Sequence, residues 1–261
     1  MAHSFSFNDI PFSGATYAVT KLRGLIPWAP GVRAEITEFA RQDGGVVAPS
    51  SYGVRSIEFL GLVQASGYSD LITHLDAIAL ALNERADCKL EFDEISDRYW
   101  MARFTGMSAT PVSKDCAEIT FQFLAADPHA FAATASEDLN NTITNANGQA
   151  VTITPAVGGT CQAYPVLVFT SNASIGQVVV VHDTTDDRIE WIGSLTSGDK
   201  LRIDCDPRSL LVEECPSGGE YAASMSGVEG RHPYLLPSQS NVLTIYGFTG
   251  NFDATWRNRY L

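Results

Sequence analysis

The feature that most constrains this fold is a strand that ends abruptly at an Asp-Pro pair. From Lys114 to Phe131 the sequence reads Lys-Asp-Cys-Ala-Glu-Ile-Thr-Phe-Gln-Phe-Leu-Ala-Ala-Asp-Pro-His-Ala-Phe. Alternate positions are apolar, with the period of two that is typical of a half-buried strand: Ala117, Ile119, Phe121 and Phe123. Proline lacks the N–H that a ladder needs and restricts the residue before it, so Asp127-Pro128 should stop the strand. Small and polar residues follow, and they predict that a second domain begins here.

Residues 1–132 should form the first domain, an antiparallel α+β unit with about seven strands. Ser4 to Ile10 alternates as a first strand. An Asp-Gly pair between two β-rich runs predicts a hairpin within Ile36–Tyr52. Residues 69–84 should form the one helix, capped by Ser69, with a single apolar stripe: Leu71, Ile72, Leu75, Ile78, Ala79 and Leu82.

Residues 133–261 should form a second, wholly β domain. Short apolar runs recur about every ten residues between turns rich in Gly, Asn, Asp and Ser, a pattern typical of a sandwich or jelly roll. The predicted fold class is therefore mainly β with one helix.

Composition narrows the function classes. The net charge is −13, and both halves are acidic, which argues against binding to nucleic-acid phosphates. It would suit a surface that nucleic acid must pass without sticking, although ordinary solubility charge is the simpler explanation. Five cysteines at wide spacings predict neither a disulfide framework nor a zinc site, and they fit folding in a reducing cytoplasm. No run of about 18 apolar residues occurs, so we expect no membrane-spanning helix.

No catalytic motif is present. The sequence lacks Gly-x-Ser-x-Gly, His-Glu-x-x-His, a Walker loop and Gly-x-Gly-x-x-Gly, and its five histidines are scattered. Carboxylates cluster at 183–187, 204–206 and 213–214, where glycosidase chemistry is conceivable, but turn formation explains them more simply. Trp191, Trp256 and Tyr221 could form a sugar-stacking platform, although core and edge roles are favoured. We therefore expect no enzymatic activity, no cofactor and no metal site.

Several strings, in this order along the chain, resemble a known family. They are Phe5–Ile10, the hairpin tip Arg41–Gly44, the strand and stop Phe121–Phe131, Asn145–Gly148, Gly198–Asp204, Pro237–Ile245 and Trp256–Leu261. Together they resemble the distal tail protein, or baseplate hub, of long-tailed non-contractile phages. One departure is Ser238-Gln239-Ser240, where that family has Pro-Gly before the asparagine.

The resemblance implies a structural protein of the virion, assembled in the host cytoplasm and placed at the tail tip. Its N-terminal domain would build a hexameric ring, and its C-terminal domain would be a galectin-like β-sandwich at the periphery. The ring would join the tail tube protein to the tail-associated and receptor-binding proteins, and DNA would pass through its channel without specific binding. The galectin sugar motif His-x-Asn-x-Arg does not occur in this sequence.

Candidate ring contacts lie on the predicted hairpin and on the strand after it: Phe39, Arg41, Asp43, Gly44, Tyr52 and Arg55. An extended hairpin can add strands to a neighbouring subunit. A hairpin that folds back on its own domain is about as plausible. Two other functions stay open at this point: a carbohydrate-binding module formed by residues 133–261, and a polysaccharide hydrolase that uses Asp187 or Asp206.

Overall fold

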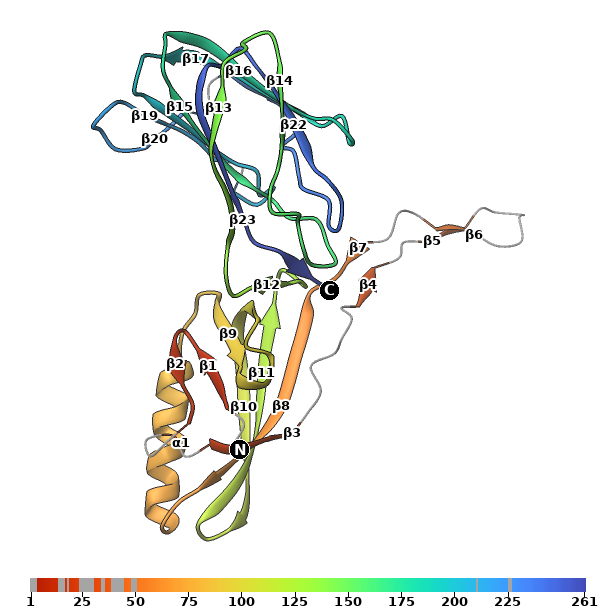
Figure 1. The fold of residues 1–261 in the computed structure, drawn as a ribbon. Helices are drawn as coiled ribbons and strands as arrows, with labels where there is room; N and C mark the ends of the chain where they lie inside the picture. The colour runs from red at the N-terminus through yellow and green to blue at the C-terminus, as the bar shows by residue number, and fades with distance from the viewer. Residues whose placement is uncertain are drawn as a thin grey trace. The chain divides into compact units, whose positions relative to one another are not determined.

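The computed structural model describes residues 4–13, 17, 19–23, 31–33, 36–38, 45–47, 51–209, 211–224 and 227–261. The chain divides into two compact units, Met1–Ala133 together with Leu261, and Thr134–Tyr260. Each unit contains its own antiparallel strand pairs (Figure 1).

The main sheet of the first unit has the strand order β2-β1-β9-β10-β11-β8-β3. These strands are β1 (Phe5–Phe7), β2 (Ile10–Pro11), β3 (Val19–Arg23), β8 (Arg55–Gln64), β9 (Cys88–Phe92), β10 (Arg98–Ser113) and β11 (Cys116–Ala125). A 3-10 helix (Asp93–Ile95) joins β9 to β10, and β12 (Ala130–Ala132) pairs with the start of β10. Four short strands form two separate pairs: β4 (Val32–Arg33) with β7 (Ser51–Tyr52), and β5 (Ile36–Glu38) with β6 (Gly45–Val47).

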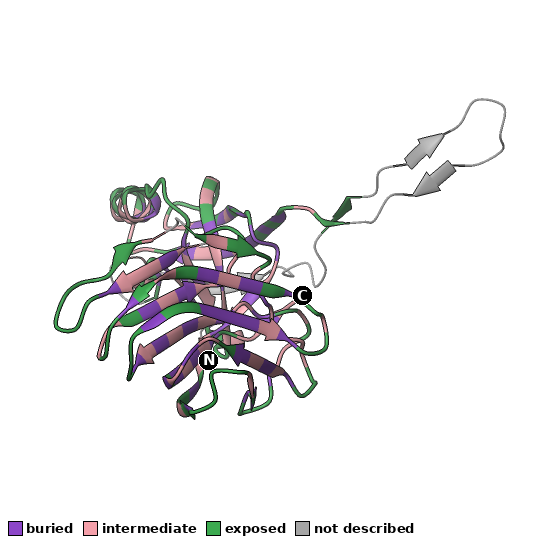
Figure 2. Cartoon of the chain, turned by 90° about the horizontal axis from the view of Figure 1, so that it is seen from above, coloured by how far each residue is buried: buried purple, intermediate pink, exposed green. Residues whose placement is uncertain are grey.

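An aromatic core fills the first unit. Strand β10 pairs with β9 through its first part and with β11 through its second, and its register shifts between Phe104 and Gly106. The ring of Phe5 on β1 lies 4.9 Å from that of Phe59 on β8 and 5.1 Å from that of Phe121 on β11. Side chains from both halves of the sheet therefore meet in one core. The alternation predicted for β11 is confirmed, because buried residues recur at every second position, and β8 shows the same pattern. Figure 2 shows strands along which buried and more exposed residues alternate.

The predicted helix is confirmed as α1 (Tyr68–Leu82), but two of its predicted details are wrong. Its N-cap is Gly67, with no side-chain cap; instead Asp70 accepts hydrogen bonds from the backbone N–H and the hydroxyl of Ser66, at 2.8 and 2.9 Å. These bonds lower the pKa of Asp70. The buried stripe is also narrower than predicted: it holds Leu71, Ile78 and Leu82, while Ile72 is exposed.

The first strand is interrupted where a single strand from Ser4 to Ile10 is predicted. Asn8 and Asp9 both adopt a positive φ, 52° and 60°, and turn β1 back onto β2. Two consecutive left-handed residues make the turn that suits the twist of a tight hairpin, and Asn and Asp tolerate this conformation.

The second unit is a two-sheet antiparallel sandwich. One sheet has the order β13-β23-β15-β18-β19-β20 and the other β14-β22-β16-β17-β21. The first contains β13 (Ser136–Ile143), β15 (Val166–Ser171), β18 (Lys200–Asp204), β19 (Val212–Cys215), β20 (Ala222–Ala223) and β23 (Gly250–Trp256). The second contains β14 (Gln149–Thr152), β16 (Ile175–His182), β17 (Arg188–Leu195), β21 (Val228–Gly230) and β22 (Val242–Tyr246); a last short strand is β24 (Arg259–Tyr260).

Both sheets of the second unit contribute to one core. Phe169 and Phe252 come from the first sheet, Trp191 and Ile245 from the second, and all four are fully buried. The predicted fold class, mainly β with one helix and a C-terminal sandwich, is confirmed.

Candidate functional site

The described residues between Gly31 and Val54, namely 31–33, 36–38, 45–47 and 51–54, form strand pairs of their own, and we call them the hairpin arm. Its described strands pair in two steps, Val32 opposite Tyr52 in one and Ile36 opposite Val47 in the other. The hairpin predicted here is thus confirmed in its pairing. Neither pair is hydrogen-bonded into the main sheet.

The base of the arm is apolar and exposed. Val32 is 59% exposed, Tyr52 44% and Val54 46%. Val32 and Tyr52 lie opposite each other in the ladder. Exposed apolar side chains that lie together are typical of a surface that another molecule covers.

The predicted ring-contact residues divide into two groups. Phe39, Arg41, Asp43 and Gly44 lie outside the residues that the structure describes. Tyr52 is exposed on β7, whereas Arg55, at the start of β8, is only 2% exposed. A contact of any of these residues with a neighbouring subunit stays a prediction.

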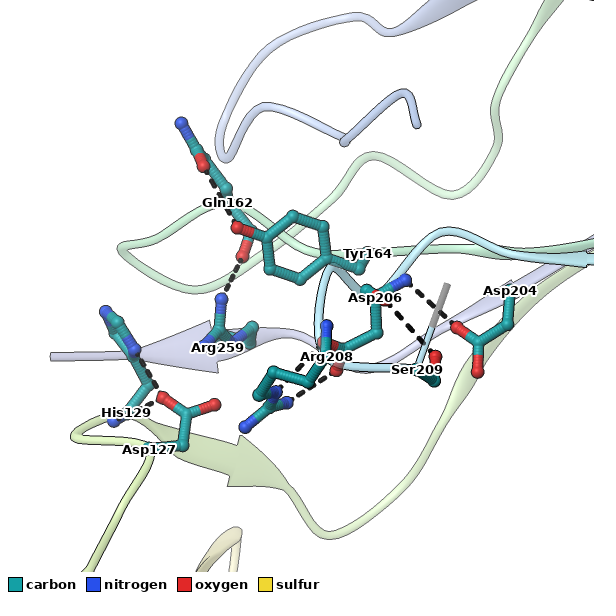
Figure 3. Close-up of polar contacts among 9 residues, drawn as sticks. All are labelled: Asp127, His129, Gln162, Tyr164, Asp204, Asp206, Arg208, Ser209 and Arg259. Carbon is teal, nitrogen blue, oxygen red and sulfur yellow. Dashed lines mark hydrogen bonds and ion pairs between the residues drawn. The ribbon is translucent and has the colours of Figure 1, made fainter. Parts of the chain in front are cut away.

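The Asp-Pro stop after β11 builds a compact polar turn. One carboxylate oxygen of Asp127 accepts the backbone N–H of His129 at 3.1 Å and lies 2.8 Å from Nδ1 of its ring (Figure 3). A side chain that accepts the N–H two residues further on forms an Asx turn. The side chain of Asp127 is only 4% exposed, so the turn is a fixed structural element at the end of the strand.

The solvent-facing side of β8 and β11 is mixed: polar side chains alternate there with the partly exposed Leu60, Leu62 and Leu124. Glu58 and Gln122 lie opposite each other in the ladder, and the Gln122 amide donates to the Glu58 carboxylate at 3.1 Å. Glu118 is exposed on the same strand as Gln122. Arg103, at the neighbouring strand β10, is paired with Asp87 at 3.0 Å. Among the described side chains on the outer face of β8 and β11, the charged ones are carboxylates.

The carboxylate clusters of the second unit serve turns and strand pairs. Asp186 has a positive φ of 59° in the turn between β16 and β17. Asp206 accepts hydrogen bonds from the Arg208 side chain and backbone N–H, and Asp204 accepts the N–H of Asp206 (Figure 3). Burial opposes ionisation of Asp206, yet its pKa is lowered because the bonds and charge of Arg208 outweigh the burial.

These clusters do not form a metal site. No group of three or more His, Cys, Asp or Glu side chains suited to a metal ion occurs in the described part of the chain. The five cysteines are free; Cys88, Cys205 and Cys215 are buried, and Cys116 and Cys161 are half-buried.

The aromatic residues give no sugar platform of the kind considered from the sequence. Trp191 is 0% exposed and Trp256 3%, so both belong to the core of the sandwich, and Tyr221 alone of the three is exposed. The core role favoured for the tryptophans is confirmed.

Sequence reasoning missed a buried polar clamp in the second unit. Asn241 is 1% exposed; its side-chain oxygen accepts the N–H of Leu236 at 2.7 Å and lies 3.1 Å from Nε2 of the fully buried His182. Its amide donates to the carbonyls of Leu236 and Gln239. The sequence signal that could have indicated this clamp is Asn241 itself, the asparagine that ends the string Pro237–Asn241.

The turn at Ser238 shows how this chain folds without the Pro-Gly pair expected from the resemblance. Ser238 itself adopts a positive φ of 57°, the conformation that glycine takes most readily. The clamp by Asn241 therefore holds the turn although glycine is absent.

The string Gly198–Asp204, which also resembles the distal tail family, begins in a turn. Gly198 has a φ of 93°, and Asp199 accepts the N–H and the hydroxyl of Thr196, both at 2.7 Å. Hydrogen bonds from Thr196 lower the pKa of Asp199. These residues shape the entry into β18.

Among the described helices, none is long and apolar enough to cross a membrane.

Comparison with known proteins gives structural matches only. No protein-family model and no curated protein matches the sequence. The structure, however, is similar over 100% of both chains to the SPP1 Dit protein (gp 19.1), described as a paradigm of the hub adsorption apparatus in phages that infect Gram-positive bacteria, with a TM-score of 0.77 at 14% identity. The chain has the Dit fold.

Two further structures support the same fold. They are the baseplate of phage P2 in its activated conformation, with Ca and with Sr, at TM-scores of 0.53 and 0.52 and identities of 9% and 8%. Each match covers 98% of both chains. The resemblance to distal tail proteins inferred from the sequence is thus confirmed at the level of the fold.

Proposed function

We propose that this chain is the hub component of a phage tail tip, a structural protein of the virion that forms a hexameric ring. The observation that carries the proposal is the match to the SPP1 Dit protein along the entire length of both chains. Because the match covers 100% of both chains, the two units of this chain match the SPP1 Dit protein together and not one at a time.

In this proposal the domain of residues 1–132 builds the ring and that of residues 133–261 lies at its periphery. The ring joins the tail tube protein to the tail-associated and receptor-binding proteins. The protein is assembled in the host cytoplasm and resides at the tail tip.

The hairpin arm supports a role in ring closure. Its described strands belong to none of the three larger sheets, and its base exposes Val32, Tyr52 and Val54. A hairpin of this kind can add its strands or its apolar face to a neighbouring subunit. The ring-contact residues proposed from the sequence are Phe39, Arg41, Asp43, Gly44, Tyr52 and Arg55; of the two that the structure describes, Tyr52 belongs to the arm and Arg55 directly follows it.

The described residues on the outer face of β8 and β11 include no positively charged side chain, which supports the passage of DNA. A channel wall that lets DNA slide must not bind phosphates, and basic side chains would do so. Glu58 and Glu118 are negatively charged, Gln122 is neutral, and the carboxylate of Asp87 offsets the positive charge of the neighbouring Arg103.

The proposal is tested by changing the arm without touching the core. Val32→Ser and Val54→Ser remove exposed apolar surface, so folding should be unaffected while each subunit contact weakens about tenfold. Light scattering should then show the six-chain species shift toward monomer.

Matched controls are Leu139→Ser and Ile192→Ser, which are exposed to a similar degree, 47% and 51%, on the second unit. They should leave the ring intact. A ring that resists removal of residues 36–52 as well would overturn the role of the arm.

A further inference from the structure

The hairpin arm leaves the first unit beside the end of strand β11. In the ladder between β8 and β11, Arg55 lies opposite Ala125. Because the strands are antiparallel, the residues before Arg55 and the residues after Ala125 leave the ladder at the same end. Tyr52 precedes Arg55 by three positions, and His129 follows Ala125 by four. The topology therefore brings the base of the arm to the turn formed by Asp127.

Asp127 fixes the imidazole of His129 in two ways. The same carboxylate oxygen accepts the backbone N–H of His129 and lies 2.8 Å from its Nδ1. A carboxylate oxygen can only accept, so Nδ1 carries the proton and donates. The side chains of Asp127 and His129 are 4% and 15% exposed, which keeps water from competing for this bond.

The fixed imidazole contacts the arm. The ring of Tyr52 packs against that of His129 with centroids 5.9 Å apart and planes at 88°, an edge-to-face arrangement. Aromatic pairs favour this geometry because the positive edge of one ring meets the negative face of the other.

The base of the arm has little else to hold it among the described contacts. Among the described residues, its ladder shows two residue pairs, Val32 with Tyr52 and Arg33 with Ser51, and one further bond from the Gly53 N–H to the Gly31 carbonyl at 2.7 Å. An isolated ladder of this size is marginally stable in water. A contact between its last residue and a rigid turn limits the directions that the arm can take.

We propose that Asp127 and His129 form a seat for Tyr52 that positions the arm for ring closure. Asp127 and His129 are positioning residues here: they act through Tyr52 and touch no neighbouring subunit. The proposal rests on the ring function proposed above, and it adds the device that aims the arm.

Hydrogen exchange of the full-length protein, followed by mass spectrometry, measures the seat directly. Peptides that cover residues 51–54 report the Gly53 N–H. His129→Ala and Tyr52→Ala should each raise exchange there about two- to tenfold, and the double variant should raise it no further than the larger single effect. Asp127→Asn keeps an acceptor oxygen but loses the charge, so it should give a smaller rise. Tyr68→Ala, an exposed tyrosine on α1 in the same unit, is the control and should change nothing.

Assembly is measured on the same samples by light scattering. His129→Ala should reduce the six-chain fraction although its side chain is mostly buried, and thermal stability should stay close to that of the parent. Additive exchange effects in the double variant overturn the seat itself. Coupled exchange in a ring that remains whole overturns the role of the seat in ring closure. A parent protein that is monomeric overturns the ring function alone, and the coupling in exchange then decides whether the seat exists.

Discussion

Replacing Asn241 by alanine should destabilise the second unit strongly, because one buried side chain holds a whole turn together. Its oxygen receives the Leu236 N–H and faces His182 Nε2, and its amide donates to the carbonyls of Leu236 and Gln239, at 3.0 and 3.2 Å. The His182 ring is oriented by the Thr185 N–H, which donates to its Nδ1 at 3.2 Å. Nε2 therefore carries the proton and is the donor to Asn241.

The magnitude follows from the groups that alanine would leave behind. The variant orphans two donors, the Leu236 N–H and the Nε2–H of the fully buried His182. Each buried donor without a partner costs about 1–3 kcal/mol, so we expect a loss of about 3 kcal/mol in the free energy of unfolding. For a chain of this size that corresponds to a fall of about 6–12 °C in the melting temperature.

Thermal and urea unfolding followed by circular dichroism measure this loss. Ser240→Ala, one position earlier and exposed, is the matched control and should change stability by less than about 0.5 kcal/mol. Asn241→Asp separates the two halves of the clamp, since it keeps the acceptor and loses both donors. A cost below about 1 kcal/mol for Asn241→Ala would refute the reasoning, because the turn would then hold without its clamp.

Three further predictions concern the core, a strained turn and a thiol. Phe121→Ala opens the aromatic core around Phe5 and Phe59 and should cost about 3–5 kcal/mol in urea unfolding; a loss under about 1 kcal/mol would show that the core can collapse around the gap. Ser238 has a left-handed backbone conformation, which costs about 1 kcal/mol for a non-glycine residue, so Ser238→Gly removes this cost. Glycine also makes the unfolded chain more flexible, which cancels part of the gain, and the free energy of unfolding should rise by up to about 1 kcal/mol. A clear loss of stability contradicts the argument. Burial, and then the charge of Asp204, raises the pKa of the Cys205 thiol, so iodoacetamide at pH 8 should label the native protein at Cys161 well before Cys205, and equal labelling would be inconsistent with this burial.

Features that depend on neighbours along the chain were predictable from the sequence. The alternation in β8 and β11 gave the buried faces of both strands, because successive side chains of a strand point to opposite sides. Asp127-Pro128 gave the strand stop, because proline acts on its immediate neighbours. The two-sheet sandwich followed from the spacing of strands and turns in the second half.

Features that depend on distant residues were not predictable. The pair His182 and Asn241 spans 59 positions, and nothing near either residue indicates the other. Tyr52 and His129 meet because β8 and β11 share a register that local patterns do not give. The predicted helix cap is wrong for a different reason: the Asp70 carboxylate accepts the N–H and the hydroxyl of Ser66, and the helix begins at Tyr68 with Gly67 as its N-cap.

The measurement that tests the central claim most directly is the solution mass of the purified full-length protein, by light scattering and native mass spectrometry, with negative-stain images of the same peak. Six chains of 28.2 kDa predict about 169 kDa and a six-fold ring with a central hole. A strict monomer at every concentration, with and without a tail tube protein present, would contradict the account.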